Sequence, residues 1–112
     1  MDPGDVWNVS LPLSGGREQS GVRPAILIQD DAYAQASPLA LIIPMTSQLA
    51  ALRLPGTVRI EPSTTNGLTA SSIAMVFQMR ALDRSRFRDK LGRISEDEIR
   101  AILLELNRLT GQ

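Results

Sequence analysis

Hydrophobic and polar positions along the first half of the chain follow the two-residue period of β-strands more closely than the period of a helix. A partly alternating stretch predicts a first strand over 6–11, and an apolar, β-branched stretch predicts a second over 23–29. A third strand is expected over 39–44, where a proline would end it. Residues 12–22 and 30–37 are rich in polar and turn-forming residues and are expected to be loops.

The second half continues with short strands and turns. Asn66 followed by Gly67 is a strong turn signal, because both residue types tolerate the backbone angles of tight turns. In chain order we expect a loop over 46–55, a half-exposed strand over 57–61, a turn over 62–67, strand material over 68–82 that is clearest over 72–77, one helical turn over 83–87 and a short extended piece over 91–94.

The last element is a helix with a clear start signal. Ser95 and Glu98 have the spacing of a capping box, in which each side chain accepts a hydrogen bond from the backbone N–H of the other residue. Gly111 is expected to end the helix. We interpret its apolar stripe as a face that packs on the core rather than as a surface for a partner. The stripe consists of Ile99, Ile102, Leu103, Leu106 and Leu109.

The order of these elements indicates the fold class. Several short strands followed by one helix argue against a doubly wound sheet, in which strands and helices alternate. We therefore expect a mainly β fold with an α-helix, in which a small antiparallel barrel or curled sheet is capped by the C-terminal helix. At 112 residues, the chain is expected to form a single domain over 1–112.

Composition narrows the possible chemistry. The sequence contains no cysteine and no histidine, which excludes disulfides, thiolate catalysis and cysteine-ligated metals. Acid–base chemistry must then use Asp, Glu, Arg, Tyr, Lys or groups of the substrate. We expect no metal and no cofactor. The N-terminus lacks the pattern of a signal peptide and no apolar run is long enough to span a bilayer, so we expect a cytoplasmic protein with no membrane partner.

Charge is balanced overall, with twelve basic and twelve acidic residues, but it is unevenly distributed. Residues 80–93 contain six basic side chains against Asp83 and Asp89. Two interpretations are open, a solvated surface and a patch that attracts phosphate. Eleven of the twelve basic residues are arginine, whose planar guanidinium suits phosphate, and this bias favours the second interpretation.

The segment 16–24 combines charge with a rigid base. It is a polar, glycine-bounded stretch that holds Arg17, Glu18 and Arg23 and runs directly into the apolar residues 25–28. A buried strand that begins at Arg23 would hold the guanidinium in a fixed direction. Charged loops beside rigid strands are common binding and catalytic sites, so this segment is the first candidate for function.

Several motifs, taken in order, resemble those of one protein family. They are Gly4-Asp5-Val6-Trp7, Gly16-x-Glu18-Gln19-x-Gly21-x-Arg23-Pro24, Ile43-Pro44-Met45-Thr46-Ser47, Gly67-Leu68, Gln78-Met79-Arg80-Ala81-Leu82-Asp83 and Ser85-Arg86. Together they resemble the MazF/PemK (Kid) ribosome-independent mRNA interferase toxins, and the resemblance runs from Gly4 to Leu109.

The resemblance implies an SH3-like barrel with a C-terminal helix, assembled as a homodimer. It also implies metal-independent, sequence-specific cleavage of single-stranded RNA, which leaves a 2′,3′-cyclic phosphate and a 5′-hydroxyl. A further implied partner is a cognate antitoxin protein whose disordered tail covers the RNA groove. Two alternatives stay open: a non-catalytic toxin on the same fold, like the CcdB gyrase poisons, and a catalytically silent relative that binds RNA or antitoxin.

The resemblance also implies roles for individual residues. Arg23 would stabilise the charge on the reacting phosphate and take part in proton transfer, Thr46 would donate to a phosphate oxygen, and Glu18 would act as a base or hold Arg23. Each also has a purely structural interpretation: a salt bridge for Arg23, a loop-capping hydrogen bond for Thr46 and a solvated charge for Glu18. The expected RNA-binding residues are Arg17, Gln19, Ser20, Ser47, Gln78, Arg80, Arg84 and Arg86.

The chain departs from the family pattern just before Gln78. Many relatives have an acidic residue immediately before this glutamine, and some have arginine two residues further back, where this chain has Phe77 and Met75. A chain without that acid must rely on Arg23 and Thr46, cleave weakly or recognise a different RNA. Phe77 has two interpretations, a core or dimer contact and an aromatic face that stacks on a base.

Overall fold

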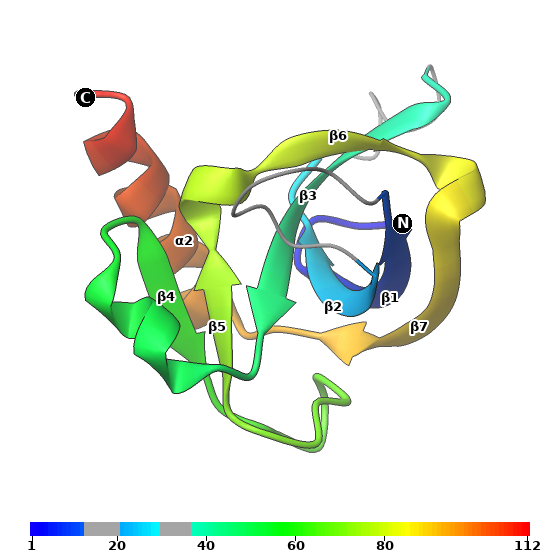
Figure 1. Ribbon diagram of the computed structural model, residues 1–112, viewed down its shortest axis with the longest axis horizontal. Coiled ribbons are helices and arrows are strands. Elements are labelled where there is room, and N and C mark those ends of the chain that lie inside the picture. Colours follow the sequence, from blue (N-terminus) through cyan, green and yellow to red (C-terminus); the bar gives the residue numbers. More distant parts are fainter. Residues whose placement is uncertain (13–20, 30–36) are drawn as a thin grey trace.

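The strand β3 (Leu39–Thr46) organises the sheet, because it pairs with three other strands. The computed structural model describes residues 1–12, 21–29 and 37–112 (Figure 1). The other elements are β1 (Asp5–Leu11), β2 (Gly21–Leu27), η1 (Leu49–Arg53), β4 (Thr57–Ile60), β5 (Ser72–Met75), η2 (Val76–Gln78), β6 (Arg80–Asp83), η3 (Arg84–Arg86), β7 (Phe87–Arg93) and α2 (Glu96–Leu109).

All strand pairs are antiparallel, in the order β4-β5-β3-β2-β1-β7, and β6 pairs with β3 beside this path. Figure 1 shows the strands curling around a common interior, and α2 packs beside β4 and η2. The expectation of a mainly β fold with a curled antiparallel sheet and a C-terminal helix is confirmed. The hydrogen-bonded path is open within the described residues, because it ends at β4 and β7 without joining them.

The second edge of β3 is shared by β5 and β6, which are separated by an insertion. Met45 lies opposite Ala74, and Ile42 lies opposite Arg80. A step of three residues along β3 therefore corresponds to a step of six residues from β5 to β6. The three extra residues form the 3-10 turn η2. The prediction of strand over 72–77 is wrong at its last two residues, because a bulge of this kind leaves the apolar pattern of the strand unchanged.

Two clusters of buried side chains pack on opposite faces of the central strands. On β3, Ile43 and Met45 belong to a first cluster that includes Ile102 of α2, whereas Ala40 and Ile42 belong to the second. Strands that are buried on both faces show continuous apolar runs instead of strict alternation. The second cluster is flanked by Trp7 and Phe87, whose rings meet edge to face with centroids 5.6 Å apart.

The helix α2 begins as expected. The Glu98 N–H donates to Ser95 Oγ at 3.1 Å and the Ser95 N–H donates to Glu98 Oε1 at 2.9 Å, which completes the capping box. Gly111 follows the helix with a φ of +79°, as an end signal requires. No helix within the described ranges is long and apolar enough to cross a membrane.

The apolar stripe of α2 is only partly a core face. Ile102 is buried, and Ile99 and Leu106 pack against the first cluster. Leu103 and Leu109 are 47% and 42% exposed, so their assignment to the core is wrong. The stripe is wider than the contact with the sheet, and helical periodicity alone does not reveal the width of that contact.

Other boundaries differ in informative ways. The strand expected to end at Pro44 continues to Thr46, and the loop expected over 46–55 contains η1. The helical turn expected over 83–87 is η3, and the extended piece expected over 91–94 is the end of the longer β7. β7 has many charged, exposed side chains, which conceal its strand character. Of the loops expected over 12–22 and 30–37, residues 13–20 and 30–36 lie outside the described residues. The first loop was predicted to extend too far, because Gly21 and Val22 belong to β2.

The turn over 62–67 is confirmed, and it packs more tightly than a surface turn requires. The Asn66 side chain is fully buried, and its Oδ1 accepts hydrogen bonds from the N–H groups of Ser63 and Leu68 at 3.1 and 3.0 Å. Its Nδ2 donates to the Glu61 carbonyl at 2.8 Å. Gly67 then crosses β7 so closely that a Cβ atom would lie 2.1 Å from the Leu91 carbonyl oxygen.

We predict that Gly67→Ala destabilises the fold by about 2–4 kcal/mol, because it adds a backbone clash to a φ of +70° that alanine rarely adopts. Gly21→Ala is the matched control, since Gly21 also has a positive φ but no neighbour within 4 Å of the added Cβ. Urea unfolding of both variants measures the difference. Equal losses of stability would contradict a steric role for Gly67.

Candidate functional site

The ladder between β2 and β3 stops at a proline. The Ile28 N–H donates to the Leu41 carbonyl of β3 at 3.1 Å. Because N–H groups alternate between the two edges of a strand, the N–H groups at positions 26 and 24 would also face β3. Pro24 has no N–H, and the last paired residues are Ala25 and Pro44. Beyond this point both strand ends line an open cleft.

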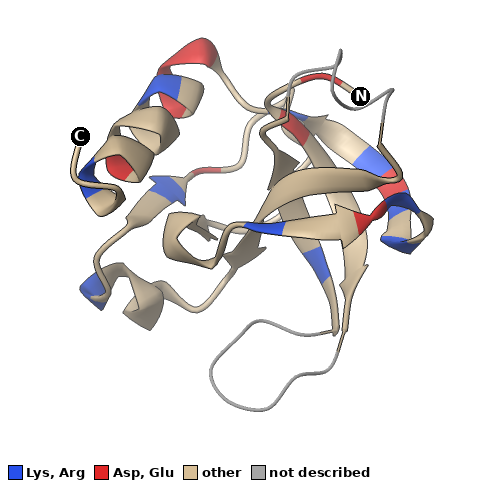
Figure 2. Ribbon diagram, turned by 90° about the horizontal axis from the view of Figure 1, so that it is seen from above, with Lys and Arg blue, Asp and Glu red and all other residues tan. Residues whose placement is uncertain are grey.

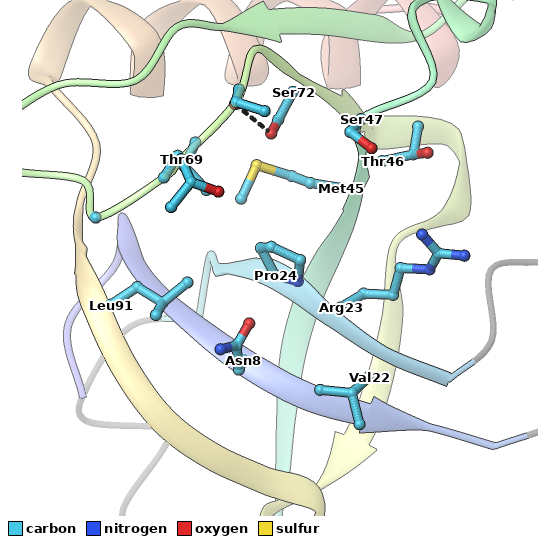
Figure 3. Close-up of a pocket in the computed structure, with 13 residues that line it drawn as sticks. Asn8, Val22, Arg23, Pro24, Met45, Thr46, Ser47, Thr69, Ser72 and Leu91 are labelled. Carbon is cyan, nitrogen blue, oxygen red and sulfur yellow. Dashed lines mark hydrogen bonds between the residues drawn. The ribbon is translucent and has the colours of Figure 1, made fainter.

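Arg23 and Thr46 are brought together by this strand ending. Arg23 and Thr46 each lie two residues beyond the last pair of the β2–β3 ladder, and both line the same clefts. Figure 3 shows the Arg23 guanidinium extending along the side of the cleft where Thr46 and Ser47 lie. Arg23 is half-buried, and Thr46 is 4% exposed. The motif pairing suggested by the sequence is therefore also a pairing in space.

The Thr46 hydroxyl is held by the backbone that follows it. Its Oγ1 accepts a hydrogen bond from the Gln48 N–H at 3.2 Å. The loop-capping interpretation of Thr46 is thus correct, and it does not compete with a chemical role. A hydroxyl that accepts one hydrogen bond still has its own proton to donate, and this proton can be directed at a ligand oxygen in the cleft.

Two clefts share Arg23 and Thr46 in their walls. The first, which we call the Ser47 cleft, has a volume of about 330 Å³ and extends over β1, β2 and the loop after Gly67. The second, which we call the Phe77 cleft, has a volume of about 560 Å³ and extends over η1 and η2. Both volumes lie in or near the range typical of ligand sites, roughly 300–1,000 Å³.

A third hollow of about 240 Å³ continues the series. It shares Phe77 and Gln78 with the Phe77 cleft and adds Met79 and Arg80. Three hollows in a row with shared walls provide successive sites along one surface. Such a surface suits an extended, repeating ligand better than a compact one.

The structure brings together some of the predicted site residues and separates others. Arg23, Thr46, Ser47 and Gln78 line the two clefts, and Arg80 lines the third hollow. The remaining predicted residues of the first loop lie outside the described residues: Arg17, Glu18, Gln19 and Ser20. Their roles stay predictions.

Arg84 and Arg86 are distant from the clefts. The Arg84 N–H donates to the Pro38 carbonyl at 2.9 Å, at the opposite end of β3 from Thr46. Eight residues of strand separate Pro38 from Thr46, which is roughly 26 Å along an extended chain. Their assignment to RNA binding is untested by this geometry, but they do not belong to the cluster around Arg23.

The basic segment 80–93 is partly neutralised. Asp5 is 1% exposed, and its carboxylate lies 3.4 Å from Lys90 Nζ and 3.8 Å from Arg93 Nη1. Arg93 also lies 3.6 Å from Glu96. Figure 2 shows basic and acidic residues interspersed over the described ribbon. These two basic residues thus have structural partners, which favours the solvated-surface interpretation for the end of the segment.

The acidic residue of the Gln78–Asp83 motif also has a structural task. The hydrogen bond from the Ser85 N–H to Asp83 Oδ1, at 2.8 Å, lowers the pKa of Asp83, and the Ser85 side chain and Arg86 lower it further. Asp83 caps η3 and thereby fixes the turn into β7. Among residues 1–12, 21–29 and 37–112, no three Asp or Glu side chains gather as a candidate metal site.

Some cleft residues were not singled out from the sequence. Asn8 and Thr69 line the Ser47 cleft, and Gln48 and Arg53 line the Phe77 cleft. Asn8 directly follows the Gly4–Trp7 motif and Gln48 directly follows the Ile43–Ser47 motif, so adjacency was an available signal. Arg53 lies in η1 and had no such signal.

Comparisons with known proteins identify the family of this chain. A family model described as "PemK-like, MazF-like toxin of type II toxin-antitoxin system" matches residues 2–110. Endoribonuclease MazF of Staphylococcus saprophyticus is 31% identical over 102 residues, which cover 91% of this chain and 84% of that protein.

Solved structures give the same answer. MazF (Form-I) from Deinococcus radiodurans has a TM-score of 0.84 and 27% identity, over 100% of this chain and 97% of that chain. A MazE–MazF structure from the same organism has a TM-score of 0.78 and 26% identity, over 100% and 96%. The chain therefore belongs to the PemK-like, MazF-like family of toxins from type II toxin–antitoxin systems.

Proposed function

We propose that this protein is a sequence-specific endoribonuclease that cleaves single-stranded RNA and acts as the toxin of a toxin–antitoxin pair. The observation that carries the proposal is the placement of Arg23 and Thr46 in the shared wall of two clefts. A strand of RNA lying through both clefts would present one phosphate to both side chains. The endoribonuclease name of the Staphylococcus saprophyticus relative supports the same activity.

The proposed reaction uses the 2′-hydroxyl of the RNA as nucleophile. Its oxygen attacks the adjacent phosphorus while the bond to the 5′-oxygen of the next nucleotide breaks, which yields a 2′,3′-cyclic phosphate and a 5′-hydroxyl. The Arg23 guanidinium donates to the non-bridging oxygens as negative charge accumulates. Thr46 donates a further hydrogen bond to the same phosphate.

Proton transfer needs a group to remove the 2′-proton and a group to protonate the leaving oxygen. We propose Glu18 for the first task, or for holding Arg23, and a contribution of Arg23 to the second. Arginine rarely gives up a proton, so its main role is to stabilise charge. Ser47, Gln78 and Arg80 bind the RNA on either side of the reacting phosphate.

The remaining RNA contacts and partners are also part of the proposal. Arg17, Gln19 and Ser20 would bind RNA from the first loop, and Arg84 and Arg86 would bind it further along. The protein acts in the cytoplasm as a homodimer, and a cognate antitoxin blocks the clefts. The MazE–MazF structure of the Deinococcus radiodurans relatives supports a protein partner of this kind.

We predict that Arg23→Ala reduces cleavage of a long, mixed-sequence RNA by about 10²–10³-fold, as expected for the loss of one preorganised donor. Arg23→Lys is the matched control, because lysine keeps the positive charge but lacks the planar set of N–H donors of a guanidinium. Its cleavage rate is expected to fall by a smaller but measurable factor. Mapping of 5′ ends gives the cut sites, and circular dichroism checks the fold.

Three outcomes would contradict this assignment. Unchanged cleavage by a folded Arg23→Ala variant would exclude the proposed role of Arg23. RNA binding without discrete cuts by the unchanged protein would identify a silent relative, which the absence of an acid before Gln78 makes the main competitor. Neither binding nor cuts would favour a CcdB-like gyrase poison.

We predict that Thr46→Val slows cleavage by about tenfold or more, whereas Thr46→Ser keeps most of the activity. Both variants remove bulk or polarity at one position, but only serine keeps a hydroxyl that can bind phosphate. Initial rates on one mapped RNA oligonucleotide measure the effect. Similar rates for the two variants would exclude a catalytic role for the Thr46 hydroxyl.

We predict that excess EDTA leaves the rate of cleavage unchanged, because the proposed steps use only side chains and the RNA. The control is a metal-dependent ribonuclease inhibited in the same buffer. Strong inhibition of this protein by EDTA, reversed by a divalent cation, would replace the proposed chemistry with metal-assisted hydrolysis.

A further inference from the structure

Phe77 occupies an unusual position on the candidate RNA surface. It lies in the three-residue insertion η2, and its side chain is 40% exposed. It contributes to the wall between the Phe77 cleft and the third hollow. The core interpretation of this residue is therefore wrong, and the aromatic ring is available at the surface that Arg23 and Thr46 also line.

The backbone beneath the ring is firmly held. The Phe77 N–H donates to the Gly56 carbonyl at 3.3 Å, and the Met79 N–H donates to the Val76 carbonyl at 3.1 Å. Val76, one residue earlier, is 1% exposed and anchors the turn in the first cluster. An exposed ring on a fixed backbone loses little entropy when it binds a ligand.

The surroundings of the ring combine an aromatic surface with charge and hydrogen-bonding groups. Arg23, Arg53 and Gln78 line the same cleft as Phe77. Aromatic rings stack on the bases of single-stranded nucleic acids, arginine binds phosphates, and an amide side chain pairs with base edges. Ala50, Ala51, Leu54 and Met75 also line the cleft, and Phe77 is the one aromatic residue among the described residues of its wall.

We propose that Phe77 stacks on one nucleobase next to the phosphate that is cleaved, and that Gln78 contacts the edge of the same base. This inference rests on the proposed function and extends it by naming the side chains that select the neighbouring nucleotide. One base lies in the Phe77 cleft against the ring, and the strand passes over the ring toward Arg80 in the third hollow.

A second copy of the chain is the competing occupant of this surface. Leu54 lines the same cleft, and a Cβ added at Gly56 would meet both Phe77 and Leu109. RNA is favoured because two arginines line the cleft, whereas charged residues are depleted from the cores of protein interfaces. The shared wall with Arg23 and Thr46 also connects this cleft directly to the proposed reaction site.

The test uses RNA oligonucleotides that span a mapped cut site and carry a 2′-deoxy nucleotide at the cut, so that binding is measured without cleavage. In a series of probes, each base in turn is replaced by an abasic nucleotide. Phe77→Leu removes the ring but keeps an apolar side chain, and Phe77→Tyr restores the ring. Leu52→Ala is the control, since Leu52 is 40% exposed on η1 and lines neither cleft.

We predict that Phe77→Leu weakens binding of the intact probe by roughly 5- to 150-fold, the range for one base–aromatic stack. For the unchanged protein, an abasic nucleotide at one position next to the cut should lower the RNA affinity by the same factor. For Phe77→Leu, the same abasic nucleotide should lower the affinity hardly at all, because the stacking contact is already absent. Phe77→Tyr should recover most of the affinity, and Leu52→Ala should bind like the unchanged protein. Fluorescence anisotropy gives the affinities, and light scattering gives the oligomeric state.

Three results would overturn the inference. The first is equal RNA affinity for Phe77→Leu and the unchanged protein. The second is an additional loss for Phe77→Leu at every abasic position, which would exclude contact with one particular base. The third is dissociation of the assembly by Phe77→Leu but not by Leu52→Ala, which would assign the ring to a second copy. If the unchanged protein neither binds nor cuts RNA, the proposed function itself fails, which is a distinguishable result.

Discussion

Two prolines determine where the sheet of this protein opens. Pro24 lacks the N–H that would continue the β2–β3 ladder, so the ladder ends and leaves Arg23 and Thr46 beside an open cleft. On the opposite edge of β3, Pro44 lies between the residues paired with β6 and those paired with β5, where η2 is inserted. Both interruptions of the hydrogen bonding lie beside hollows that carry the candidate site. A missing N–H reduces by one the number of backbone groups that lose a partner where two strands separate.

The sequence was a good guide wherever a local rule also described the tertiary structure. The capping box at Ser95 and the turn at Asn66–Gly67 are local, and both were found as expected. β2 and β3 were found because their apolar runs are buried on both faces, and β1 was found from its partial alternation. Pro44 was misjudged as a strand end, because a sequence does not reveal which edge of a strand a missing N–H faces.

The candidate site was predictable only in part, since its residues are joined by strand register. Motif resemblance selected Arg23, Thr46, Ser47 and Gln78, which the fold gathers around adjoining clefts. It also selected Arg84, which the fold places at the other end of β3, and it gave no signal for Arg53. The exposure of Phe77 and Leu109 depends on how far the helix and η2 extend beyond the sheet, which periodicity does not encode.

The turn η2 changes which residues of the chain point to each face of the sheet. Ala74 and Val76 belong to the first buried cluster, and without an insertion every even-numbered residue that follows would face the same side. Across the three residues of η2 the alternation along the chain is inverted, and Leu82 belongs to the second cluster. The segment from β5 to β6 therefore contributes side chains to both clusters. Leu82 lies opposite Ala40, and opposite residues share a face, so its direction is fixed by the pairing with β3 and not by the length of η2. Residues can therefore be added or lost at η2, beside the candidate site, without turning β6 over.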